Sequence, residues 1–183
     1  MFMPAPVFLQ YLPARATDVV LLQDQNRNGY RDGLSGLGTD LLSLIEVLPE
    51  VLHFGDYRRI CFMGASSGGL PAVIAAVHLR AEIVMSVGGN SPDDVRWSEP
   101  GRTNARELLS ASRDSSRLTE IIVVYGAQCR IDEKAAQSLS QLVPTRALVI
   151  DDGARPVNHN ALLPLVQKNR LRHFLVENFR LEA

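Results

Sequence analysis

Residues 59–77 read RICFMGASSGGLPAVIAAV, and much of the architecture of the chain follows from them. The stretch begins with a short apolar run, passes through glycines and serines at residues 64–69, and continues into small residues. A short apolar run is typical of a buried strand, and the segment from about Leu70 to Leu79 has the pattern of a helix. We therefore expect a strand, a tight turn and a helix in direct succession.

Similar apolar runs recur along the chain and alternate with longer amphipathic segments. We expect strands at residues 7–12, 18–23, 59–63, 82–87, 121–126 and 146–150, and helices at residues 39–52, 70–79, 133–142 and 161–179. Thr39 is the expected N-cap of the first helix, and Pro49 should kink or end it. Strands that are apolar throughout are buried on both faces. The pattern predicts an α/β protein, doubly wound, with a mostly parallel sheet of about six strands and helices on both faces.

Composition narrows the class of protein. The 183 residues are 46% hydrophobic, enough for one domain that hides roughly 70% of its unfolded surface. The 19 basic and 20 acidic residues leave no excess positive charge for a nucleic-acid partner. No apolar run approaches the roughly 20 residues of a membrane helix, and the start MFMPAPVF lacks the basic region of a signal peptide. Cys61 and Cys129 are too few for a disulfide framework. We expect a single cytoplasmic domain, residues 1–183, with no membrane partner.

The glycine and serine cluster carries the chemistry. It contains the pattern G-x-S-x-G around Ser66, in which Gly64 and Gly68 would avoid Cβ clashes in a sharp strand-to-helix turn. The serine hydroxyl would then stand above the sheet at the amino end of a helix, whose free N–H groups stabilise negative charge. The neighbouring register, A-x-S-x-G, would present Ser67 instead. We favour Ser66, because only its register has glycine on both sides.

The GASSGG sequence resembles the elbow of α/β hydrolases, in which the catalytic serine, acid and histidine follow in that order along the chain. The resemblance extends from about residue 17 to the end. It implies an acid after the second strand beyond the elbow and a histidine in the loop after the last strand. Asp132 and His159 occupy these places, so the implied triad is Ser66, Asp132 and His159.

Each assignment has rivals. The other histidines are expected to pack or to face solvent: His53, His78 and His173. Only His159 lies in a loop at the carboxyl edge of the expected sheet, where active sites of such sheets gather. The acids that compete with Asp132 are Glu133, Asp151 and Asp152.

An acyl-enzyme reaction also needs two backbone donors for its oxyanion. The resemblance implies the N–H of Ser67 as one donor. The other should come from the loop after residues 18–23, where related hydrolases often carry His-Gly but this chain has Gln23-Asp24-Gln25. Gln25 is our first candidate for the second donor, and Asp24 is the next. An acidic side chain there opposes an oxyanion unless it points away or is paired, for which Arg27 and Arg31 are candidates.

The expected sheet is also smaller than the eight strands of many α/β hydrolases, with one strand–helix unit missing before the elbow. Residues 88–118 are polar, carry five arginines and form the only candidate cap. Trp97 is a candidate wall for an acyl or sugar pocket, or it packs beneath this excursion. The arginines suit a solvated face better than an anionic substrate. Cys129, in the loop that carries Asp132, is a candidate neighbour of the site, but we favour the interpretation as an inert small hydrophobe.

The leading hypothesis is a serine esterase, thioesterase or deacylase that acts on a small-molecule acyl ester or thioester. Acyl transfer to a sugar or another alcohol would use the same intermediate and is an alternative. A hydrolase-like domain that only binds a partner or serves as a scaffold is the non-enzymatic alternative. No cofactor or metal motif occurs, so we expect neither.

Overall fold

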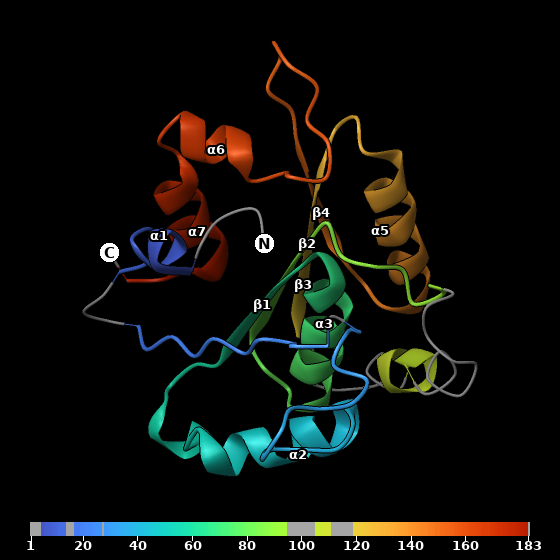
Figure 1. The fold of residues 1–183 in the computed structure, drawn as a ribbon. Helices are drawn as coiled ribbons and strands as arrows, with labels where there is room; N and C mark the ends of the chain where they lie inside the picture. Colours follow the sequence, from blue (N-terminus) through green and yellow to red (C-terminus); the bar gives the residue numbers. More distant parts are fainter. Residues whose placement is uncertain (1–4, 14–16, 27, 95–104, 111–118, 183) are drawn as a thin grey trace.

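The computed structural model describes residues 5–13, 17–26, 28–94, 105–110 and 119–182. Its strands are β1 (Cys61–Ala65), β2 (Ile83–Val87), β3 (Glu120–Gly126) and β4 (Arg146–Ile150). Its labelled helices are α1 (Ala5–Leu9), α2 (Leu41–Val51), α3 (Gly69–His78), α5 (Arg130–Leu142), α6 (Leu163–Gln167) and α7 (Leu171–Phe179) (Figure 1). Short 3-10 turns cover Phe54–Asp56 and Ser66–Gly68, and residues 105–110 form a further helical stretch between β2 and β3.

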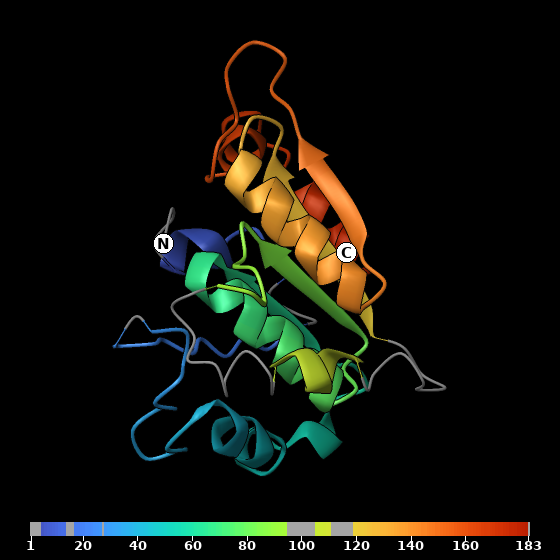
Figure 2. The same ribbon diagram turned by 90° about the vertical axis from the view of Figure 1, so that its right-hand side faces the viewer.

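The four strands are parallel and stand in chain order, β1-β2-β3-β4. Ala65 pairs with Val87, Val87 pairs with Val124, and β3 continues for two residues to Gly126, which pairs with the last residue of β4. The segments that leave the strands therefore emerge at one edge of the sheet. Parallel crossovers are right-handed, so strands that step in one direction place their crossover helices on the same face. Figure 2 shows α3, α5 and residues 105–110 together on that face.

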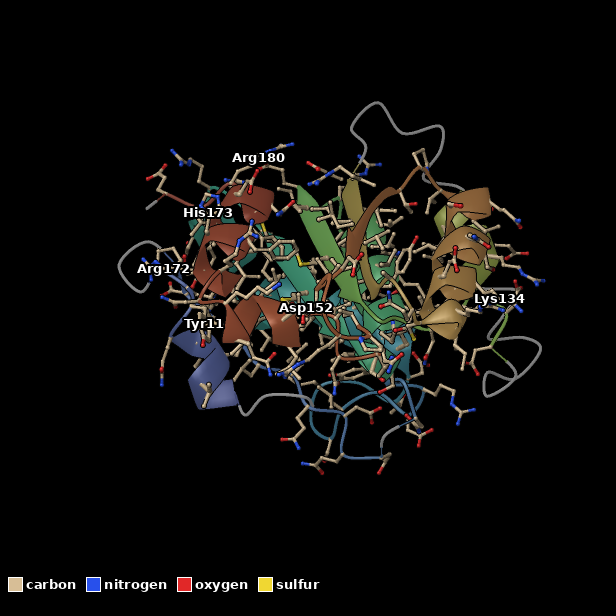
Figure 3. The ribbon with its side chains drawn as sticks, turned by 90° about the horizontal axis from the view of Figure 1, so that it is seen from above. Tyr11, Lys134, Asp152, Arg172, His173 and Arg180 are labelled. Carbon is tan, nitrogen blue, oxygen red and sulfur yellow. The ribbon has the colours of Figure 1, made fainter. Side chains whose placement is uncertain are left out.

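Helices cover the other face as well. Figure 3 looks onto the carboxyl edge of the sheet, with α1, α6 and α7 on one side and α5 on the other. Alternate residues of β2 enter different cores: Val84 packs with α3, whereas Ile83 and Met85 pack with α6 and α7. All five residues of β2 are buried. Burial on both faces explains why every residue of this strand except Ser86 is apolar, and the expected α/β class is confirmed.

The expectation of about six strands was wrong: the described part of the chain has four. Residues 7–12 fall in α1 and the turn that follows it. Phe8, Tyr11 and Leu12 pack on the α6–α7 core at the i, i+3, i+4 spacing of a helix. Residues 18–23 form no strand, and Val19, Val20 and Leu21 are exposed. Apolar content without a partner strand does not make a strand.

Helix boundaries also differ from the expected ones. Asp40, and not Thr39, caps α2: its Oδ1 accepts the Ser43 N–H at 2.8 Å, while Ser43 Oγ accepts the Asp40 N–H at 3.1 Å. Pro49 lies inside α2, which ends two residues later at Val51.

Two further differences concern the second half of the chain. Helix α5 begins at Arg130, three residues before the expected start, which brings Asp132 into its first turn. The single closing helix expected at residues 161–179 is two helices, α6 and α7, which are separated near Asn169, a residue with φ of +53°.

Residues 95–104 and 111–118 of the expected cap lie outside the described residues, so the cap stays a prediction, as does the single domain. Within the described ranges, no helix has both the length and the apolar character needed to cross a membrane.

Candidate active site

Ser66 lies at a sharp turn between β1 and α3. Its φ is +52°, in the left-handed region that a residue with a side chain rarely adopts. A Cβ on Gly64 would overlap the carbonyl oxygen of Gly68, so the chain can fold back on itself only with glycine at position 64. The Ser66 side chain is exposed at the start of the 3-10 turn that leads into α3. Ser66 therefore combines an exposed position with a strained backbone conformation.

The role expected for Gly68 was wrong. A Cβ at Gly68 would meet nothing within 4 Å, and its φ is −84°, so neither space nor conformation demands glycine there. The close approach lies one residue later. A Cβ on Gly69 would lie 2.5 Å from Ser86 Oγ and 2.6 Å from the Cα of Gly89. Glycine at position 69 therefore lets α3 pack closely against the end of β2.

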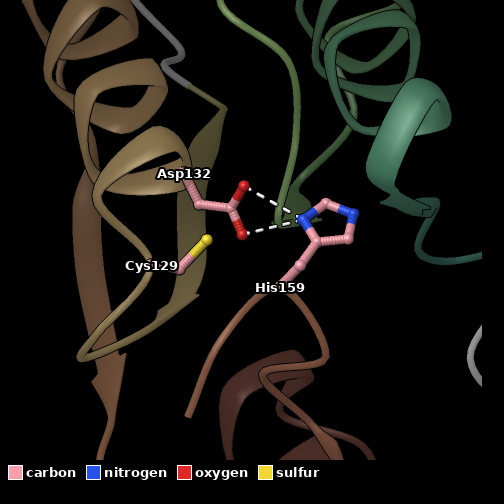
Figure 4. Close-up of side chains that lie close together, drawn as sticks. All are labelled: Cys129, Asp132 and His159. Carbon is pink, nitrogen blue, oxygen red and sulfur yellow. Dashed lines mark hydrogen bonds and ion pairs between the residues drawn. The ribbon is translucent and has the colours of Figure 1, made fainter. Parts of the chain in front are cut away.

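The structure brings Ser66, Asp132 and His159 together from the segments after β1, β3 and β4. His159 Nε2 lies 3.0 Å from Ser66 Oγ. His159 Nδ1 lies 3.0 and 2.9 Å from the two carboxylate oxygens of Asp132 (Figure 4). Asp132 is buried, at 5% exposure, whereas the His159 side chain is 49% exposed. The imidazole of His159 therefore lies between the buried carboxylate, at Nδ1, and the exposed serine, at Nε2.

This arrangement selects one tautomer of the imidazole. A carboxylate accepts hydrogen bonds, so Nδ1 carries the ring proton and donates a hydrogen bond to Asp132. Nε2 is then left with a lone pair, which accepts the hydrogen bond of the Ser66 hydroxyl. A serine hydrogen-bonded to a neutral imidazole whose other nitrogen is held by a carboxylate can lose its proton as it attacks an electrophile.

The competing acids are engaged elsewhere. Asp151 Oδ1 accepts the N–H of Gly153 at 3.0 Å within its own turn. Asp152 pairs with Lys168. Glu133 accepts a hydrogen bond from Gln137 one turn along α5, at 3.4 Å. Of the four acids weighed from the sequence, Asp132 is the one that the structure places against His159.

The other histidines lie away from this edge of the sheet. His53 follows α2 with a left-handed φ of +49°, and His78 is exposed at the last residue of α3. His173 lies on the outer side of α7, 80% exposed and 3.7 Å from Glu177 (Figure 3).

Gly88 supports the pair of Asp132 and His159 and was not singled out from the sequence. A Cβ at this position would lie 3.0 Å from Asp132 Oδ2 and 3.0 Å from His159 Nδ1. Its φ is +54°, and its N–H donates to the carbonyl of Val124 at 2.8 Å. The backbone after β2 therefore fills the space beside the acid and the imidazole. The only feature of the sequence that could have indicated this role is that Gly88 directly follows a predicted strand.

Gln128 holds the segment that carries His159. Its side-chain carbonyl accepts the N–H of Val157 at 2.7 Å, and its own N–H donates to the Val157 carbonyl at 3.1 Å. Gly126 allows this close approach, because a Cβ there would overlap the carbonyl oxygen of Val157. The loops after β3 and β4 are thus joined two residues before the imidazole. No pattern in the sequence points to this contact.

Cys129 lies beside the acid. Burial raises the pKa of its thiol, and the nearby carboxylate of Asp132 adds to the rise. One donor atom each from Cys129, Asp132 and His159 lies within 4.8 Å of the others (Figure 4). The expectation of a small hydrophobe misses this polar neighbourhood.

The loop expected to supply the second oxyanion donor is held by Asp24. Its carboxylate accepts backbone N–H groups from Asn26 at 3.1 Å, Gly29 at 2.7 Å and Tyr30 at 3.1 Å. An acidic side chain near an oxyanion was expected to need a partner. The carboxylate of Asp24 has such partners in the backbone N–H groups of its own loop. Arg27, one of the expected partners, lies outside the described residues.

The oxyanion donors themselves stay predictions. Gln25 is exposed in the Asp24 loop, and Ser67 directly follows Ser66. Trp97, the expected pocket wall, lies outside the described residues. A cavity of about 10 Å³ beside Gly88 and Asp132 has room for about one water molecule, so it is no substrate pocket.

The sequence matches no protein-family model and no curated protein. Solved structures do match. A CIB-like hydrolase of Thermoplasma acidophilum gives a TM-score of 0.52 at 14% identity, over 79% of this chain and 65% of that one. A meta-cleavage product hydrolase gives 0.54 at 12% identity, over 81% and 75%. The enterobactin esterase of Shigella flexneri gives 0.52 at 19% identity, over 87% and 42%.

These likenesses establish the fold, which is that of α/β hydrolases and includes ester-cleaving enzymes among its members. The chain spans just under two thirds of the Thermoplasma hydrolase and less than half of the esterase.

Proposed function

We propose that the protein is a serine hydrolase that cleaves small carboxylic esters or thioesters through an acyl-enzyme on Ser66. The observation that carries the proposal is the continuous chain of contacts from Ser66 Oγ to His159 Nε2, at 3.0 Å, and from His159 Nδ1 to the Asp132 carboxylate, at 2.9 Å. The left-handed backbone of Ser66 supports it independently, because such strain collects at functional residues.

In the proposed reaction, Ser66 Oγ bonds to the acyl carbon while its proton moves to His159 Nε2. Asp132 stabilises the charged imidazole that forms. The backbone N–H groups of Ser67 and Gln25 are the proposed donors to the oxyanion. The alcohol or thiol then leaves with the proton from Nε2. A water molecule, deprotonated by His159, attacks the acyl-enzyme, and release of the acid restores the Ser66 hydroxyl.

Esters are the favoured substrate class for two reasons. An alkoxide or thiolate leaves the tetrahedral intermediate more readily than the anion of an amine does, and His159 is the proposed general acid that assists its departure. One protein that shares the fold is an enterobactin esterase, and others are hydrolases, which supports the same class. A cytoplasmic location remains a prediction, which the free thiols of Cys61 and Cys129 fit.

A fluorophosphonate probe tests the nucleophile, because its phosphorus bonds to an activated serine oxygen and releases fluoride. We expect the folded protein to be labelled, the Ser67→Ala variant to be labelled as well, and the Ser66→Ala variant to be unlabelled. Turnover of short acyl esters should fall at least about 10³-fold in Ser66→Ala. If Ser67→Ala were unlabelled and Ser66→Ala were labelled, Ser67 and not Ser66 would be the nucleophile. Absence of labelling in correctly folded wild-type protein would favour the binding or scaffold alternative.

A further inference from the structure

The carboxyl edge of the sheet gathers three different metal-binding side chains. Cys129 immediately precedes α5, Asp132 lies in the first turn of that helix, and His159 reaches them from the loop after β4. A sulfur, a carboxylate oxygen and a ring nitrogen from these residues all lie within 4.8 Å of one another. Thiolate, carboxylate and imidazole are donors that zinc takes in proteins, and three protein ligands leave a position for water.

We propose that Cys129, Asp132 and His159 form an inhibitory site for Zn²⁺, a regulation that rests on the proposed hydrolase function. Zinc bonds of about 2.3 Å to sulfur and 2.0–2.1 Å to nitrogen place these two atoms about 3.5 Å apart in a tetrahedral site. The donors at present lie within 4.8 Å, so small side-chain rotations close the difference.

The surroundings of the three donors suit a cation that arrives from solvent. The His159 side chain is 49% exposed, and Cys129 is partly exposed, so an ion can reach both without opening the core. Asp132 is 5% exposed and supplies a negative charge at the inner end of the site. A buried carboxylate attracts a cation more strongly than an exposed one, because less water screens it.

Zinc bound to these three residues would stop His159 from acting as a general base, because it would change the tautomer of the imidazole. Nδ1 is the nitrogen that faces Asp132, at 2.9 Å, so it is the nitrogen that would bind the ion. A metal bond to Nδ1 moves the ring proton to Nε2, which then donates toward Ser66 Oγ. Nε2 can no longer accept the serine proton. Cys129 binds as thiolate, and its proton passes to solvent. Inhibition would therefore leave the serine in place but inactive.

Cobalt substitution gives a readout that does not depend on catalysis. Co²⁺ bound to a thiolate produces a ligand-to-metal charge-transfer band in the near ultraviolet. We expect this band in the Ser66→Ala variant, which cannot turn over substrate but keeps all three donors. The band should disappear in Ser66→Ala combined with Cys129→Ala, and persist when Cys61→Ala replaces Cys129→Ala. Competition with a chromophoric chelator would give the Zn²⁺ affinity of the same proteins.

Kinetic measurements test the consequence for catalysis. The rate of ester cleavage with Zn²⁺ is divided by the zinc-free rate of the same variant, so that any change in basal activity cancels. Loss of an outer-shell partner of a metal site costs about 10–100-fold in affinity, so loss of a direct ligand should raise the inhibitory Zn²⁺ concentration at least about 100-fold. Cys129→Ala should show this shift, Cys61→Ala should not, and a chelator should restore the wild-type rate.

The outcomes separate this proposal from the proposed hydrolase function. A cobalt band that requires Cys129, in a protein that cleaves no ester, supports the metal site and overturns the hydrolase. Ester cleavage without a Cys129-dependent band, or with equal zinc sensitivity in Cys129→Ala, overturns the metal site alone. If Cys129→Ala fails to fold, as circular dichroism would show, Cys129→Ser takes its place in each comparison, because serine keeps the shape and removes the soft donor.

Discussion

Gly88 occupies a position where any side chain would press on the acid and the imidazole. A methyl group there would lie 3.0 Å from both Asp132 Oδ2 and His159 Nδ1, tighter than an ordinary van der Waals contact. We expect Gly88→Ala to shift His159 away from Ser66 and to lower kcat/KM for a short acyl ester at least about 10²-fold, since small displacements of catalytic groups have effects of that order.

Gly153→Ala is the matched control for this substitution. Gly153 has a similar left-handed φ, +73°, but a Cβ there would meet nothing within 4 Å. Both variants bear the backbone penalty of about 1 kcal/mol, and only Gly88→Ala adds the contact with Asp132 and His159. Equal activity in the two variants would show that the space beside Asp132 is not limiting.

The individual side chains of the site differ in how far the sequence predicted them. Ser66 was predictable because its turn needs glycine at position 64, and that requirement is local. Asp132 was predictable through the resemblance, which places an acid after a particular strand. His159 had a second signal, because it is the histidine in a loop at the carboxyl edge of the expected sheet. Gly88 and Gln128 escaped prediction because their roles depend on the distance between loops that are far apart in sequence.

At the scale of the helix, α2 begins with two reciprocal hydrogen bonds between Asp40 and Ser43. We expect Asp40→Ala to lower the free energy of unfolding by about 1 kcal/mol at neutral pH, because backbone N–H groups of the first turn lose their acceptor. The midpoint of urea unfolding would measure this difference.

The same cap has a defined pH dependence. Hydrogen bonds from the Ser43 backbone, and next from its side chain, lower the pKa of Asp40 below its ordinary value of 3.8. A carboxyl group with a lowered folded-state pKa stabilises the protein above its unfolded pKa, and this contribution is lost as the pH falls through the folded value. The stability gap between wild type and Asp40→Ala should therefore narrow below about pH 4. Asp40→Asn, which caps without a charge, should lack that change. An unchanged gap in acid would contradict the charged cap.

Strands and helices were predicted well where burial dictates the sequence. All four strands of the sheet were expected within two residues of their observed bounds. Burial on both faces explains the apolar sequences of β2 and β3, whereas β4 is mostly exposed and was predicted from its short apolar run alone. Residues 7–12 were wrongly predicted to form a strand, because a six-residue apolar run fits a strand and a short helix equally well. Packing against α6 and α7 determines which of the two forms. The division between α6 and α7 depends on one left-handed residue, Asn169, which hydrophobic periodicity does not reveal.

At the scale of the molecule, Arg59 ties the end of the chain to the start of the sheet. Its guanidinium donates to the carbonyls of Arg180, at 2.6 Å, and Phe179, at 3.0 Å, and to Glu82 at 2.8 Å. Helix α7 needs such partners because the last carbonyls of a helix have none within it. We expect Arg59→Ala to lower the free energy of unfolding by about 2 kcal/mol, measured by urea denaturation.

The neighbouring residue provides the control. Arg58 pairs with Glu182 at the surface, where its side chain is 78% exposed. Such pairs contribute little, so Arg58→Ala should change the free energy of unfolding by no more than about 0.5 kcal/mol. If both variants lowered the free energy of unfolding equally, the loss of one positive charge, and not the anchoring of α7, would account for the effect.

The size of the sheet was the whole-molecule property that sequence patterns overestimated. The alternation of apolar runs with amphipathic segments predicted an α/β chain, and the observed layers agree with that class. The number of strands, however, depends on whether an apolar segment finds a partner at the edge of the sheet. Val20 and Leu21 are more than half exposed, so their hydrophobicity is not used for strand pairing within the described residues.

The order of the site along the chain has a consequence for synthesis. Ser66 stands after the first strand of the sheet, whereas His159 follows the last, 93 residues later. A ribosome that builds the chain from its amino terminus therefore releases the serine well before the histidine. For the proposed hydrolase, a nascent chain would remain inert toward acyl compounds until the segment that carries His159 docks.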